Sequence, residues 1–120
     1  MIGPFHVEVP IFLMSVVVVG NCSAEEACTA IYNYEGKRTI AEPRESQGWV
    51  QEHNGDVFMW VRDINRASIV FHELVHVAFS ICHIRGMQYD EELIAYLVGW
   101  LKIEVADKLF DLAEQAEKTP

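Results

Sequence analysis

Hydrophobic and polar residues alternate over residues 5–9, with Phe5, Val7 and Val9 separated by polar positions. A period of two is typical of a β-strand with one face buried. Pro10 interrupts this pattern, and the apolar run at 12–19 that follows predicts a strand buried on both faces. The start of the chain therefore predicts two strands joined by a short turn.

Capping and turn residues predict the next elements. Ser23, followed three residues later by Glu26, is a capping-box signature for a helix that runs to about Tyr34 and closes at Gly36. Residues 37–48 are polar and predict a connecting loop or a weak edge strand. Between the strand-like runs 49–53 and 56–61 stands Asn54-Gly55, the pair that tight hairpin turns favour.

The last third of the chain predicts two helices. Asp63 or Asn65 is expected to cap the first, which stops near Gly86, and Asp90 is expected to cap a long second helix that runs to about Ala116. The 120 residues suit one domain, 1–120. We predict an α+β fold in which a small mixed or antiparallel sheet packs on about three helices.

Charge and cysteine content narrow the partners and the compartment. A formal net charge of −9 argues against binding nucleic acid or an anionic membrane, since both require clustered cations. Residues 11–19 resemble the core of a signal peptide, but they are too short to span a bilayer and no Lys or Arg precedes them. Cys22, Cys28 and Cys82 form no CxxC pair. We therefore expect a cytoplasmic protein with free thiols.

The segment Phe71-His72-Glu73-Leu74-Val75-His76 contains an HExxH motif within an apolar, helix-compatible run. On a helix His72 and His76 lie one turn apart on the same face, so both imidazoles can bind one zinc ion. Glu73 points about a quarter turn away, where a general base would stand. The alternative is a structural helix whose two histidines are hydrogen-bonded and bind no metal.

A catalytic zinc site usually has three protein ligands. His83 is too far along the helix to share the ion, and no histidine follows it, so a carboxylate is expected. Glu92 falls on a mostly apolar helical column with Tyr96 and Ile103 that should point inward, whereas Glu91 shares its face with a lysine. Glu92 is the predicted third ligand, with Glu91 as the alternative.

With these residues the chain resembles the gluzincin zinc peptidases, which carry HExxH on one helix and a ligand Glu on a following helix. The stretch 92–100 looks like the Glu-helix of small gluzincin-like domains, including ImmA/IrrE-type proteins and phage or prophage zincins. The resemblance covers about residues 57–105. It implies a minimal zincin-like architecture, a bound Zn²⁺ and limited proteolysis of a regulatory protein. Tyr96 stands where the thermolysin-like branch has an Asp that supports a zinc histidine.

The predicted function is a zinc-dependent peptidase in which Glu73 is the general base for a zinc-activated water. A protein or peptide substrate is expected to pair in extended form with an edge strand at 57–61. The donor for the developing oxyanion is left open. Its candidates are Tyr96, Tyr89, His53 and His83. The alternative is a catalytically weak or inactive zincin-fold protein that acts as a protein-binding module.

Overall fold

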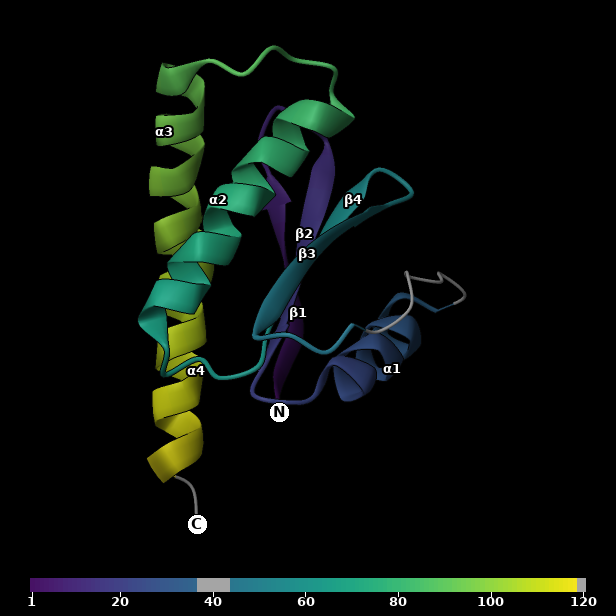
Figure 1. Ribbon diagram of the computed structural model, residues 1–120, viewed down its shortest axis with the longest axis vertical. Helices are drawn as coiled ribbons and strands as arrows, with labels where there is room; N and C mark the ends of the chain where they lie inside the picture. The colour runs from purple at the N-terminus through teal and green to yellow at the C-terminus, as the bar shows by residue number, and fades with distance from the viewer. Residues whose placement is uncertain (37–43, 119–120) are drawn as a thin grey trace.

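The computed structural model describes residues 1–36 and 44–118 of the chain. It contains a four-stranded mixed sheet flanked by helices on both faces (Figure 1), which confirms the predicted α+β class. The elements in chain order are β1 (Ile2–Val9), β2 (Met14–Gly20), α1 (Ala24–Glu35), β3 (Gly48–His53), β4 (Asp56–Val61), α2 (Ala67–Ile84), α3 (Glu91–Leu101), the π-helical turn η1 (Lys102–Ala106) and α4 (Asp107–Lys118).

The sheet has the strand order β1-β2-β4-β3. Two antiparallel hairpins, β1–β2 and β3–β4, are joined by a parallel pairing of β2 with β4, in which Val16 is opposite Val57. The expectation that residues 57–61 form an edge strand is therefore wrong: β4 is central, and the edge strands are β1 and β3. The reason is that the apolar β4 sequence buries both faces of its strand, which suits the middle of a sheet.

Alternate residues of the central strands supply two cores. Val17, Val19, Phe58 and Trp60 face α1 on one side of the sheet. Val16, Val18, Val57 and Met59 face α2 and the long C-terminal helix on the other. Trp60, Phe58 and Met59 are all fully buried and pack within these cores.

Local signals placed most of the boundaries correctly. Ser23 and Glu26 form the predicted capping box, and Asn54 and Gly55 form the turn with φ of 51° and 81°. Asp90 caps α3 by accepting from the Leu93 amide. The predicted caps of α2 are wrong, because the N-cap is Arg66 and no side chain caps the helix; Asp63 instead accepts from the Asn65 amide. Of the predicted loop or edge strand at 37–48, residues 37–43 lie outside the described residues.

The elements α3, η1 and α4 follow one another without a break and form one long C-terminal helix, which packs alongside α2 (Figure 1). Its hydrogen bonding changes from α-helical to π-helical at η1. By length and composition alone α2 would be long and apolar enough to cross a membrane, yet it packs against the sheet as a core helix. Its apolar residues Val70, Leu74, Val77 and Ile81 are fully buried. This arrangement leaves the opposite side of α2 exposed, and the motif histidines lie there.

Candidate functional site

The HExxH residues occupy two sides of α2. Leu74 and Val77 turn toward the sheet, whereas His72 and His76 lie one turn apart on the exposed side. The side chain of His72 is 64% exposed. The predicted placement of the two imidazoles on one face of a helix is confirmed.

The two imidazoles approach each other closely. His72 Nε2 lies 3.2 Å from His76 Nε2, and the ring centroids are 4.8 Å apart. Two nitrogens at this separation, each about 2.05 Å from one ion, subtend an angle of about 100° at that ion, close to a tetrahedral angle. The pair therefore fits two positions of a zinc site. The same distance also fits a hydrogen bond from one ring to the other when no ion is bound.

Glu73 lies on the buried side of the same helical turn. Glu73 is only 6% exposed, and its carboxylate Oε1 lies 3.9 Å from His72 Nε2. Burial raises the pKa of this carboxyl, and the neighbouring His76 and His72 partly oppose the rise. The position suits a carboxylate that exchanges protons beside the histidine pair.

Gly48 at the start of β3 makes room for Glu73. A methyl group added at Gly48 would lie 3.1 Å from Glu73 Cγ and 2.9 Å from the Trp60 carbonyl oxygen. Any larger residue here would press on the carboxylate side chain or on the central strand. The edge strand and the motif helix therefore meet closely at the candidate base.

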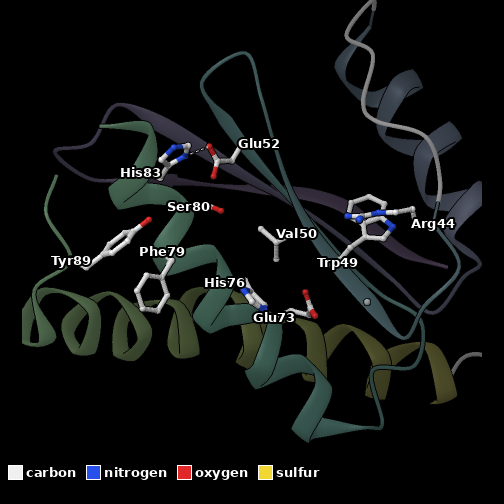
Figure 2. A pocket seen from close by; sticks show the side chains of 11 residues that line it. Arg44, Trp49, Val50, Glu52, Glu73, His76, Phe79, Ser80, His83 and Tyr89 are labelled. Carbon is white, nitrogen blue, oxygen red and sulfur yellow. Dashed lines mark hydrogen bonds and ion pairs between the residues drawn. The ribbon is translucent and has the colours of Figure 1, made fainter. Parts of the chain in front are cut away.

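A cavity of about 510 Å³ opens between α2 and the edge strand β3. In Figure 2 Glu73 and His76 lie along it, Arg44 is toward one end, and Phe79 and Tyr89 are toward the other. Gly48, Val50 and Glu52, alternate residues of β3, line its opposite wall. The cavity thus brings an extended strand alongside the motif helix.

The Tyr89 end of the cavity carries a hydrogen bond that the sequence did not predict. His83 Nδ1 lies 2.7 Å from Glu52 Oε1 and links the last turn of α2 to β3 (Figure 2). The period-two spacing of Gly48, Val50 and Glu52 before the Asn54-Gly55 turn was the available signal for these lining residues.

The predicted third ligand is not assembled with the pair. Within residues 1–36 and 44–118, no group of three His, Cys, Asp or Glu side chains is placed to hold a metal ion. Glu92 and Glu91 are both exposed at the start of α3, and they line a separate pocket with Phe79 and Tyr89. The role of Glu92 as a ligand stays a prediction.

The reasoning that favoured Glu92 over Glu91 is wrong. The column expected to point inward is exposed, with Tyr96 at 68% and Ile103 at 62%. Leu97 and Leu101 supply the buried face of α3 instead. Because α3 is apolar on nearly every side, its hydrophobic pattern did not identify the face that packs against α2.

Two of the four candidate oxyanion donors, Tyr89 and His83, line the cavity with Glu73 and His76. Tyr96 lines a different pocket, beside the β1–β2 turn. His53, at the end of β3, is not among the lining residues. Tyr89 is the freer of the two remaining donors, since His83 is paired with Glu52.

No protein-family model, curated protein or solved structure matches the chain.

Proposed function

We propose that this protein is a zinc-dependent peptidase whose site is built on His72, His76 and Glu73. The observation that supports this most directly is the pair of imidazoles 3.2 Å apart beside a buried carboxylate, on the wall of an open cavity. Purely structural zinc sites need no such carboxylate and usually close the ion with four ligands.

Bound zinc would polarise the scissile carbonyl and make a water molecule more acidic. His72 and His76 would hold the ion, with Glu92 as the predicted third ligand. Glu73 accepts the proton of the attacking water and delivers it to the nitrogen of the leaving amine as the C–N bond breaks. The burial that raises the pKa of Glu73 makes its carboxylate a stronger base for taking up this proton.

The substrate is proposed to be a protein or peptide segment in extended form. The outer edge of β3 is the sheet edge beside the cavity, so a segment that added to it would run past His76 and Glu73. This assigns substrate pairing to β3 in place of the central strand β4. The three free cysteines agree with a reducing compartment, and we propose a cytoplasmic location.

Metal analysis of protein purified without an affinity tag tests the zinc site. Wild type should hold one zinc per chain, and His76→Ala should lose it. His53→Ala is the matched control, because His53 does not line the cavity. A His76→Ala protein that keeps a full equivalent of zinc would refute the site. The same analysis of Glu92→Ala and Glu91→Ala identifies the third ligand.

Glu73→Gln tests the general base. This variant should keep its zinc but lose hydrolysis, because an amide cannot take the proton. Both proteins are incubated with a cytosolic proteome, and new peptide termini are read by mass spectrometry. Cleavage by wild type alone establishes a peptidase, whereas loss of zinc in the variant would show that Glu73 is itself a ligand.

The second candidate function is a protein-binding module of the same fold without turnover. It is favoured by one observation, that no third metal-binding side chain joins the histidine pair among the described residues. A zinc-loaded wild type that produces no new termini across the proteome would support this function over the peptidase.

A further inference from the structure

The β1–β2 turn exposes two apolar side chains in an unusual backbone conformation. We call residues 10–13 the hairpin tip. Ile11 and Leu13 are 92% and 87% exposed, and their φ angles are 73° and 53°. Phe12 between them packs against the core. The tip therefore holds one side chain inward and presents its two neighbours to solvent.

Neither exposed residue suits its place in the isolated chain. A positive φ is unfavourable for residues with a Cβ, and most of all for a β-branched residue such as Ile11. Water is also an unfavourable surrounding for both side chains. Asparagine or glycine would satisfy the backbone and the solvent together. Residues that break two local rules at one place indicate a compensating role outside the folding of the monomer.

The hairpin tip is held in this conformation by α2. The guanidinium of Arg85 donates to the carbonyl oxygens of Phe12 at 2.5 Å and Leu13 at 2.7 Å. Beside it, Tyr96 and Trp100 of α3 form a small cavity with Ile11 and Phe12. Ile11 borders Tyr96 at this cavity, and Leu13 lies two residues further along the same turn. We call Ile11, Leu13 and Tyr96 the tip surface.

Acidic residues lie on the elements that carry or pair with the tip surface. Glu8 pairs with Ser15 just below the hairpin tip, and Asp56 accepts from the Ser15 amide. Three more carboxylates lie at the start of α3, four to six residues before Tyr96, and the guanidinium of Arg85 donates to the carbonyl oxygens of the turn. These acidic residues are Glu8, Asp56, Asp90, Glu91 and Glu92.

We propose that the tip surface binds a segment of a partner protein that is apolar and flanked by basic residues. The apolar side chains of the segment would cover Ile11, Leu13 and Tyr96, and its cations would meet the surrounding carboxylates. A second copy of this chain would bring like charges together, and an anionic membrane would be repelled. The proposal is independent of the peptidase site, because it concerns binding at another surface.

Two variants and a matched control test this surface. Ile11→Asn and Leu13→Asn remove the apolar side chains and relieve the positive-φ strain. Each should raise the melting temperature by a few degrees. Ile103→Gln, which changes another well-exposed apolar residue outside the tip surface, is the control. Two synthetic peptides with leucines at the same central positions serve as probes. One is flanked by lysines and the other by glutamates.

The lysine-flanked peptide should bind wild type and Ile103→Gln equally in a fluorescence anisotropy titration. Ile11→Asn or Leu13→Asn should weaken the binding of this peptide about fivefold or more, and the glutamate-flanked peptide should not bind. Equal binding of both peptides, or binding that the Asn variants leave unchanged, would overturn the proposal. So would association of wild type with phosphatidylcholine or phosphatidylserine vesicles, or self-association in sedimentation, that the Asn variants abolish.

Discussion

Gly48→Ala tests the close approach of the edge strand to the candidate base. The added methyl group would lie 2.9 Å from the Trp60 carbonyl oxygen and 3.1 Å from Glu73 Cγ. The first contact is with backbone of the central strand β4, which is paired on both sides and cannot move without disturbing the sheet. The edge strand must therefore shift outward, or Glu73 must leave its position.

The expected cost follows from the two effects of the substitution. Overpacking a well-packed site costs about 1–3 kcal/mol. Replacing glycine by alanine returns about 0.4–1 kcal/mol, because the unfolded chain has fewer conformations to lose. We expect a net loss of about 1–2 kcal/mol in the free energy of unfolding, together with reduced hydrolysis if Glu73 is displaced.

Gly99→Ala is the matched control in the same chain. Gly99 lies inside α3, and a methyl group there meets nothing within 4 Å. Its replacement should stabilise the protein by about 0.5–1 kcal/mol through helix propensity. Urea unfolding of both variants measures whether the free energy of unfolding falls for Gly48→Ala and rises for Gly99→Ala. A Gly48→Ala protein as stable as Gly99→Ala, with unchanged hydrolysis, would refute the close approach.

Three further results are expected from denaturant unfolding. Leu74→Ala should lower the free energy of unfolding by about 2–5 kcal/mol, because this side chain is fully buried against the sheet. Val75→Ala, at a partly exposed neighbour, should lower it by less than about 1 kcal/mol. Equal losses in the two variants would contradict the described packing face of α2. Ser23→Ala should cost about 1 kcal/mol by removing the capping bond to the Glu26 amide, and no loss would exclude the capping box. Hydrogen bonds from the Ser23 backbone and side chain lower the pKa of Glu26, so its stabilising effect is present at neutral pH and fades as pH falls through that lowered pKa. Wild type should therefore exceed Glu26→Gln in stability at pH 7 but not at pH 2, and a constant difference would contradict this linkage.

Short-range signals predicted the elements because a few residues decide each one locally. Ser23 and Glu26 satisfy the free amides of one helix end, and Asn54-Gly55 supplies the two positive φ angles of a tight turn. The placement of His72 and His76 on one face of a helix followed in the same way from their spacing of four. These features do not depend on how distant parts of the chain pack.

The remaining features depend on contacts between distant segments. The central position of β4 is set by its parallel pairing with β2, which no local pattern encodes. The packing face of α3 was equally undetermined, since Leu97 and Leu101 are buried while equally apolar positions are exposed. The π-helical turn at Lys102–Ala106 also breaks any extrapolation of helical phase into α4.

The mixed sheet has a consequence for how the chain folds. Each hairpin joins strands that are neighbours in sequence, so its loop is short and its closure costs little entropy. The parallel pairing of β2 with β4 joins segments on either side of α1 and must close a much longer loop. We expect the two hairpins to form early and the middle of the sheet to assemble last. Because α2 packs over the β3–β4 hairpin, the histidine pair joins β1 and β2 only when this last pairing forms.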